Sequence, residues 1–344
     1  MVTQILVELL RILKFLIKTL VLPCHADRKL KIRVKYGKLN INEGREFMIY
    51  TLTFNPAIDY CVKPVQFAVG QINSCDWNRA YAGGKGINVA RVLKQLGAEP
   101  TVLGFIAGFT GEAVRQSMAD MGIATDFVVL PSGMTRINVK IRCGVETDIN
   151  CTGPQIDKES LDRLFDRISA LQDGDWLILA GSLPAGLPEN TYEMLLEALG
   201  EKSVTVAADT TGNKLLRILK YRPFVIKPNH VELGELFGCK AESEEEILAL
   251  ARRAQDLGAR NVLVSRAEKG ALLLTETGEV LKAPLFSGSV VNTVGAGDSM
   301  LAGFLCGILQ TGDMAYALRL GAAAGAATVF SDDLADRAAI ERLL

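Results

Sequence analysis

The sequence predicts an α/β protein in which helices cover both faces of a mainly parallel central sheet. From residue 48 onward, short apolar runs alternate with amphipathic segments, which is the rhythm of repeated strand–helix–strand units. A parallel sheet of this kind is buried on both faces, which explains why its strands read as apolar runs. Two stretches break the rhythm and predict a second, smaller sheet.

The elements of the central sheet follow from the periodicity of apolar residues. Apolar runs predict strands at 49–54, 101–105, 127–130, 176–180, 204–208, 224–226, 262–265, 271–274 and 280–282. Helical periodicity predicts helices at 86–96, 111–121, 157–170, 189–199, 211–219 and 243–257. The last two strands are joined by Glu276, Thr277 and Gly278, which predict a hairpin at one edge of the sheet.

The two exceptional stretches lie at about 57–80 and 134–151. Both alternate polar and apolar residues without a helix between them, and in the second Arg136, Asn138, Lys140 and Arg142 share one face of a strand. Strands inserted from two places in an α/β core can pair with each other. We therefore expect these stretches to form a small β-sheet that acts as a lid over the site.

The first 47 residues differ from the rest. Charged side chains at Glu8, Arg11, Lys14 and Lys18 interrupt the apolar run 7–22, which argues against a membrane span. A basic amphipathic helix on a membrane and a targeting segment are two interpretations. Because Met48 stands directly before the first predicted strand, we expect residues 1–47 to be a disordered extension or an over-long start. The functional body is then 48–344.

Composition favours a cytoplasmic enzyme with one large core. The chain has 344 residues, of which 49% are hydrophobic, and its net charge of −1 offers no electrostatic attraction for nucleic acid. Its seven cysteines are scattered and include no C-x-x-C pair, which argues against a disulfide framework or a zinc site. Histidine occurs only at His25 and His230, so acid–base chemistry falls mainly to carboxylates, lysines or water.

The most informative segment is 292–298, Asn-Thr-Val-Gly-Ala-Gly-Asp, which runs directly into the apolar stretch 300–309. A glycine-bearing turn that opens a helix presents the backbone N–H groups of Gly295, Ala296 and Gly297 as a cradle for phosphate. Asp298 would be repelled by a bound phosphate unless it takes a proton from an attacking hydroxyl. The segment predicts a phosphoryl-transfer site. The alternative is an ordinary turn with Asp298 as a helix cap.

A second glycine-rich segment, 82–88, reads Ala-Gly-Gly-Lys-Gly-Ile-Asn and precedes a predicted helix. Its glycines, Gly84 among them, let the backbone approach a ligand, while Lys85 and Asn88 supply hydrogen-bond donors. The spacing is not that of a P-loop. Lys85 alone could instead be a solvated surface charge.

Other polar residues follow predicted strands, where open α/β sheets bind their ligands. Asp59 follows strand 49–54 and Ser182 follows strand 176–180, and each could contact a substrate or only shape a turn. Asn229 and Glu232 follow strand 224–226, on neighbouring positions of a starting helix. Glu232 could order magnesium, directly or through water, or be a favourable acid in a first helical turn.

Together these segments resemble the ribokinase-like sugar kinases of the phosphofructokinase B family, over essentially all of 48–344. Segments 82–90 and 292–299 match the two glycine motifs of the family, and Asn229-x-x-Glu232 matches its magnesium-associated motif. The resemblance implies a ribokinase-like fold with ATP and Mg²⁺ as cofactors. It also implies phosphoryl transfer from ATP to a sugar phosphate, and a homodimer formed through the β lid.

The family pattern implies a role for each matching residue. Asp298 becomes the catalytic base, and the amides of Gly295, Ala296 and Gly297 become the anion hole. Lys85 and Arg136 are our assignment for the phosphate already on the sugar, because two cations distinguish a phosphorylated sugar from a neutral one. The sugar-phosphate positions are Asp59, Gly84, Lys85, Asn88, Arg136 and Ser182. The nucleotide positions are Lys227, Ser265, Gly270 and Thr293, and the magnesium positions, through water, are Asn229 and Glu232.

The resemblance is strongest to members that phosphorylate the C6 hydroxyl of fructose 1-phosphate and so make fructose 1,6-bisphosphate. It rests on segments 52–59, 135–140, 181–184, 227–229 and 299–300. Tagatose 6-phosphate and fructose 6-phosphate are alternative substrates within the family. A neutral-sugar or nucleoside kinase would need no second cation, and a sugar-phosphate sensor on the same fold would need no catalytic base.

Overall fold

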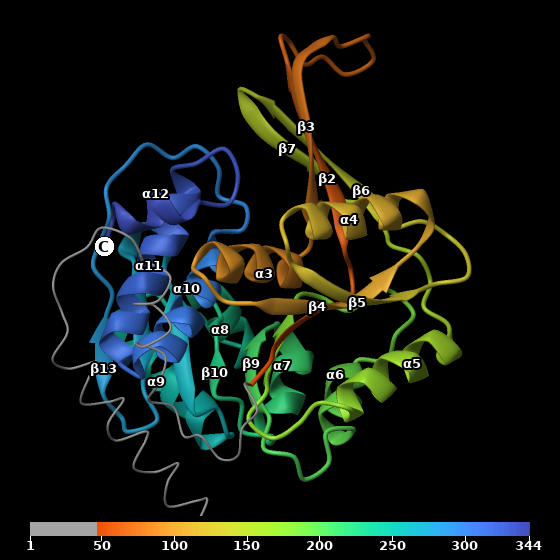
Figure 1. Ribbon diagram of the computed structural model, residues 1–344. Helices are drawn as coiled ribbons and strands as arrows, with labels where there is room; N and C mark the ends of the chain where they lie inside the picture. Colours follow the sequence, from red (N-terminus) through yellow and green to blue (C-terminus); the bar gives the residue numbers. More distant parts are fainter. Residues whose placement is uncertain (1–46) are drawn as a thin grey trace, which may run out of the picture. The chain divides into compact units, whose positions relative to one another are not determined.

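The computed structural model describes residues 47–344, and the expectation for the N-terminal extension lies outside them except for Phe47. Its centre is a nine-stranded sheet in the order β13-β12-β11-β10-β9-β8-β1-β4-β5 (Figure 1). Pairing is parallel from β5 through β11, and β12 and β13 are antiparallel, so the mainly parallel sheet is confirmed. The strands are β1 Ile49–Thr53, β4 Pro100–Ile106, β5 Ala124–Val129, β8 Trp176–Ala180, β9 Thr205–Asp209, β10 Val225–Ile226, β11 Asn261–Ser265, β12 Ala271–Leu274 and β13 Val280–Lys282.

Helices cover both faces of this sheet, as the sequence predicted (Figure 1). In β8, Leu177 and Leu179 belong to the core with α5 to α9, whereas Ile178 and Ala180 belong to the core with α3, α10 and α11. A strand with two buried faces therefore needs an uninterrupted apolar run. The helices are α3 Lys85–Gln95, α4 Gly108–Asp120, α5 Lys158–Ser169, α6 Thr191–Glu197, α7 Gly212–Leu219, α8 His230–Leu236, α9 Glu244–Asp256, α10 Ala296–Thr311, α11 Met314–Val329 and α12 Arg337–Glu341.

The two inserted stretches form the expected small sheet, in the order β3-β2-β6-β7. Its strands are β2 Ala57–Pro64, β3 Cys75–Gly83, β6 Arg136–Cys143 and β7 Val145–Ile149, and it projects from the central α/β layers in Figure 1. Strands β2 and β6 are parallel, with Asp59 beside Asn138 and Cys61 beside Lys140. This register puts the polar residues of both stretches on the same face of the small sheet.

Helix α11 was not predicted. Both α10 and α11 are mostly buried and rich in alanine and glycine, so neither has the polar stripe that marks an amphipathic helix. Glycines at the contact allow a close approach: a Cβ on Gly303 would lie 2.7 Å from the Leu320 carbonyl oxygen. Within residues 47–344, no helix combines the length and the apolar character that crossing a bilayer requires.

Candidate active site

A cavity of about 540 Å³ brings together most of the predicted site residues. Its lining comes from the small sheet, from the starts of α3, α8 and α10, and from the carboxyl ends of β10 and β11. A neighbouring cavity of about 340 Å³ shares Lys85, Arg136 and Glu232 with it and adds Ser182. The larger cavity is lined by Asp59, Gly84, Lys85, Asn88, Arg136, Asn138, Lys140, Asn150, Lys227, Asn229, Glu232, Ser265, Val294, Gly295, Gly297 and Asp298.

Asp298 lies in the first turn of α10 and is only 5% exposed. Asn88, on α3, donates a 2.8 Å hydrogen bond from Nδ2 to Oδ2 of Asp298. Burial raises the pKa of Asp298 to about 6; Asp209 adds to the shift, while Lys85, Asn88 and Lys227 oppose it. A carboxylate with this pKa can accept a proton near neutral pH.

The turn before α10 is shaped for an anion. Gly295 caps the helix with a left-handed φ of 80°, and Ala296 donates only a long 3.4 Å bond to the Thr293 carbonyl. Within residues 47–344, the N–H groups of Gly295 and Gly297 have no protein acceptor. The Lys227 amine is close to the same turn, since a Cβ on Gly297 would lie 3.1 Å from its Nζ. Backbone donors, a helix terminus and an ammonium group thus converge on one place.

Asp209, the last residue of β9, joins two lysines that line the cavity. Its Oδ2 lies 3.2 Å from Lys85 Nζ and its Oδ1 lies 3.4 Å from Lys227 Nζ. Burial alone would raise the pKa of this carboxyl, but Lys227 and Lys85 hold it below its usual range. Sequence reasoning missed Asp209, although it directly follows the predicted strand 204–208 and so meets the criterion that singled out Ser182.

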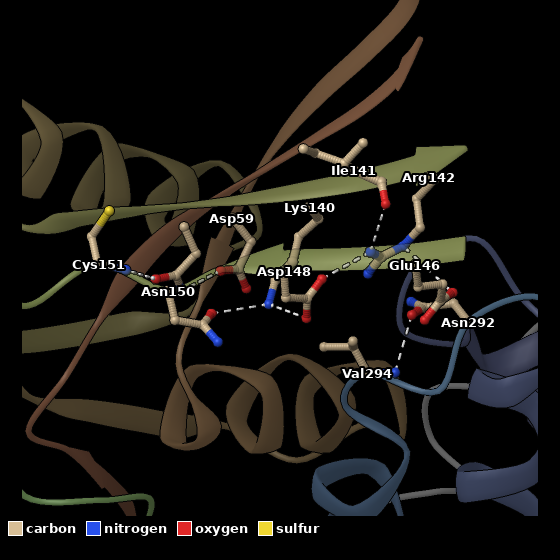
Figure 2. A network of polar contacts seen from close by, with 11 residues as sticks. Asp59, Lys140, Ile141, Arg142, Glu146, Asp148, Asn150, Cys151, Asn292 and Val294 are labelled. Carbon is tan, nitrogen blue, oxygen red and sulfur yellow. Dashed lines mark hydrogen bonds and ion pairs between the residues drawn. The ribbon is translucent and has the colours of Figure 1, made fainter. Parts of the chain in front are cut away.

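On the small sheet, Asn138 positions Asp59 and Lys140 is already paired. Asn138 donates a 2.7 Å hydrogen bond from Nδ2 to Oδ1 of Asp59. Lys140 donates to Asp148 Oδ2 at 2.8 Å and to Asn150 Oδ1 at 3.2 Å, and Figure 2 shows this network facing the turn before α10. Asn138 and Lys140 therefore line the larger cavity, although the sequence had not assigned either of them to the site.

Arg136 differs from the other cations of the cavity. Its guanidinium donates to the carbonyl oxygens of Asn55 and Cys151, both at 3.3 Å. In the described part of the chain it has no carboxylate within ion-pair distance, and its buried Nε has no hydrogen-bond partner. Of the two cations assigned to a sugar phosphate, Arg136 lacks an anionic partner, whereas Lys85 already has one.

Asn229 and Glu232 form a capping box at the start of α8. The Asn229 side chain accepts from the Glu232 N–H at 2.8 Å, and Glu232 Oε2 accepts from the Asn229 N–H at 2.8 Å. Both residues line the larger cavity. Residues 47–344 contain no cluster of three His, Cys, Asp or Glu side chains arranged for a metal. Asn229 and Glu232 by themselves offer few oxygen ligands, which fits a magnesium ion that is bound mainly by phosphates and water.

Two of the four predicted nucleotide positions line the larger cavity, and the other two do not. Ser265, the last residue of β11, bridges to Asn229 and lines the larger cavity together with Lys227. Gly270 and Thr293 line neither cavity. Gly270 instead packs closely on Leu285, because a Cβ at Gly270 would lie 2.8 Å from a Leu285 methyl group.

Comparison with known proteins gives the family. The model of the pfkB family carbohydrate kinases matches residues 52–338. The chain is 43% identical over 297 residues to a 1-phosphofructokinase of Bacillus subtilis, covering 86% of this chain and 97% of the relative. It is 39% identical over 291 residues to a D-tagatose-1-phosphate kinase of Bacillus licheniformis, covering 84% and 95%.

Solved structures agree on the architecture. Phosphofructokinase-2 of Escherichia coli, in complex with substrates and products, superimposes with a TM-score of 0.82 at 25% identity, covering 86% of this chain and 98% of that one. Ribokinase of Arabidopsis thaliana, complexed with ribose and ATP, superimposes with a TM-score of 0.70 at 21% identity, covering 87% and 99%. The expected ribokinase-like fold is confirmed.

Proposed function

This chain belongs to the pfkB family of carbohydrate kinases, and we propose that it transfers the γ-phosphoryl group of ATP to the C6 hydroxyl of fructose 1-phosphate. The observation that supports the proposal most directly is the position of Asp298. A buried carboxylate with a pKa of about 6 stands at the positive end of α10, beside N–H groups that can receive a phosphoryl group. The products would be fructose 1,6-bisphosphate and ADP.

In this mechanism Asp298 accepts the proton of the C6 hydroxyl as its oxygen attacks the γ-phosphorus in line with the leaving group. The N–H groups of Gly295 and Gly297 and the Lys227 ammonium stabilise negative charge on the transferred group. Asn88 holds the accepting carboxylate in place through its 2.8 Å hydrogen bond. Magnesium, when bound, would neutralise phosphate charge, and Asn229 and Glu232 would hold it through water.

The phosphate already on the sugar would bind at Arg136, with Lys85 and Ser182 nearby in the smaller cavity. A half-buried guanidinium without an anionic partner gains most from a phosphate ligand, because each charge compensates the other. Relatives suggest two candidate substrates, since one is named for fructose 1-phosphate phosphorylation and another for tagatose 1-phosphate. The two sugars carry their phosphate at the same carbon.

Substrate competition tests the proposed function. We expect kcat/KM for fructose 1-phosphate to exceed that for tagatose 1-phosphate, tagatose 6-phosphate and fructose 6-phosphate by at least about tenfold, or roughly 1.4 kcal/mol. The measurement couples ADP release to a recording enzyme at several concentrations of each sugar phosphate. A higher kcat/KM for any other sugar phosphate would show that this other compound, and not fructose 1-phosphate, is the preferred substrate.

Turnover is expected to fall as the pH decreases through about 6, since only ionised Asp298 accepts a proton. The direction of this pH dependence follows from the direction of the pKa shift. Burial raises the pKa of Asp298 above its ordinary value of 3.8, so the acid limb lies higher than for a solvated aspartate. The measurement is kcat/KM against pH, with circular dichroism as a control for folding. An acid limb at about pH 4 would contradict the environment assigned to Asp298.

Substituting Gly83 by alanine should displace Asp59. A Cβ on Gly83 would lie 2.2 Å from Asp59 Oδ2, so the carboxylate must leave its hydrogen bond with Asn138. We expect KM for the sugar phosphate to rise about tenfold while KM for ATP stays constant. Ala80→Ser, at an exposed position on β3, is the matched control. Equal KM values for wild type and Gly83→Ala would remove Asp59 from the sugar site.

We propose that the protein is a homodimer formed through the small sheet. The face of β2 opposite Asp59 carries an apolar set that continues into the loop between β2 and β3, and such a patch favours association. Tyr60→Glu should therefore give monomers in light scattering, whereas Lys158→Glu, on α5, should not. Monomeric wild type would contradict the proposal. The exposed apolar residues are Tyr60, Val65, Phe67, Val69, Ile72 and Ile149.

A further inference from the structure

Asp209 is a charged residue of the cavity region that no motif of the sequence identified. It is 1% exposed, and its two carboxylate oxygens face two different lysines, one at the start of α3 and one after β10. We propose that Asp209 is a positioning residue for phosphoryl transfer, which holds the Lys85 and Lys227 amines at the cavity that contains Asp298. The inference rests on the proposed function and adds a residue to it.

The geometry supports positioning because the two lysines reach the cavity from separate elements. A lysine side chain has four rotatable bonds, so an amine without a fixed partner samples many positions. Lys85 instead donates a 3.2 Å hydrogen bond to Oδ2 of Asp209, and Lys227 forms an ion pair with Oδ1 at 3.4 Å, without a hydrogen bond. Asp209 is itself held by the sheet, where it pairs in register with Ala180 of β8. Asp209 thus fixes the positions of both amines relative to the central sheet.

The position of each amine matters for a different reactant. The Lys227 amine is close to Gly297, in the turn that would receive the transferred phosphoryl group. Lys85 lines both cavities, including the smaller one with Arg136 and Ser182, where the sugar phosphate would bind. A carboxylate between the two amines also offsets the repulsion between their positive charges. One residue therefore serves the donor and the acceptor sides of the reaction.

Asp209 also acts on Asp298 through charge. Its negative charge raises the pKa of Asp298, whereas Lys85 and Lys227 lower it. Removing the charge of Asp209 leaves two uncompensated cations near Asp298, so Asp298 should become a weaker base. The other charged groups that line the cavity are Asp59, Arg136, Lys140 and Glu232.

The test is Asp209→Asn in the full chain. Asparagine keeps the shape, but it carries no charge and its single carbonyl oxygen can accept from only one of the two amines. We expect kcat to fall about 10- to 100-fold, KM for both substrates to stay the same or decrease, and the acid limb of the pH profile to move down by about half a unit or more. A merely structural carboxylate would not move the acid limb.

Asp175→Asn is the matched control. Asp175 is also fully buried, but it accepts hydrogen bonds from the Met48 and Gln172 N–H groups and lines neither cavity. This variant should lose thermal stability and keep the wild-type pH profile. An unshifted acid limb in Asp209→Asn with near-normal kcat would overturn the proposal. If Asp209→Asn does not fold, Asp209→Glu decides: its retained charge should keep the limb in place while kcat falls, and a displaced limb would overturn it.

A second readout separates this inference from the proposed function, because it needs no turnover. Asp209 raises the pKa of Lys85 despite its burial, so the pairing keeps the amine protonated and unreactive. Acetylation of Lys85 by acetic anhydride, followed by mass spectrometry, should be several times faster in Asp209→Asn than in wild type. The exposed Lys158 amine is the internal reference. Unchanged acetylation would overturn the positioning role, whereas failure of every hexose phosphate as a substrate would overturn only the proposed function.

Discussion

Replacing Asp298 by asparagine is expected to lower kcat about 10²- to 10⁴-fold, because the attacking hydroxyl loses its general base. Binding should survive, since the backbone donors of Gly295 and Gly297 and the Lys227 ammonium are unchanged. The measurement is steady-state kcat, together with the dissociation constants of ATP and fructose 1-phosphate by calorimetry. Loss of turnover with retained binding would support the role of base. Near-normal turnover would refute it and leave the proposed anion-binding turn without a catalytic role.

The same variant, Asp298→Asn, should be more stable than wild type at neutral pH. Burial raises the pKa of Asp298 to about 6, so the folded state favours the protonated carboxyl. This contribution to stability is present below the unfolded value of 3.8 and is lost as the pH rises through about 6. The substituted asparagine has no charge to bury, and its carbonyl oxygen can still accept from Asn88. We expect a gain of about 1–3 kcal/mol at pH 8 that disappears near pH 4. A gain independent of pH would contradict this explanation.

Substituting Gly307 by alanine is expected to destabilise the protein by about 1–3 kcal/mol. Its Cβ would lie 2.5 Å from the Cα of Ala317, which is backbone and cannot rotate away. Helix propensity alone predicts the opposite sign, because alanine in a helix interior is about 1 kcal/mol better than glycine. The sign of the change in the denaturant midpoint therefore shows whether contact between α10 and α11 or propensity dominates.

Ala315→Val is the control for Gly307→Ala. Residue 315 is exposed on α11, so the extra methyl groups meet no backbone and should cost only a few tenths of a kcal/mol. Kinetic constants of the surviving folded enzyme should stay near wild type in both variants. An unchanged or higher midpoint for Gly307→Ala would mean that α10 and α11 are further apart than the structure places them.

Much of the site could be predicted from sequence because its parts are continuous segments. The turn 292–298 contains both the proposed phosphate cradle and Asp298, and segment 82–88 contains Lys85 and Asn88. Strand ends supplied Ser182, because the carboxyl edge of a parallel sheet gathers such residues. The same rule named Asp59, which the structure places within β2 of the small sheet. The same reasoning could have identified Asp209, but nothing local distinguished it from the polar turn that it begins.

The strand and helix pattern, the two glycine motifs and the family follow from the sequence by itself, since periodicity and backbone conformation are properties of short segments. The tertiary structure alone decided which charges meet. Lys85 and Asp209 are 124 residues apart, and Asn88 and Asp298 are 210 apart, yet each pair is in contact. It also decided the helical state of 314–329, where burial on several sides removes the polar stripe. Both depend on packing between distant segments, which no local pattern encodes.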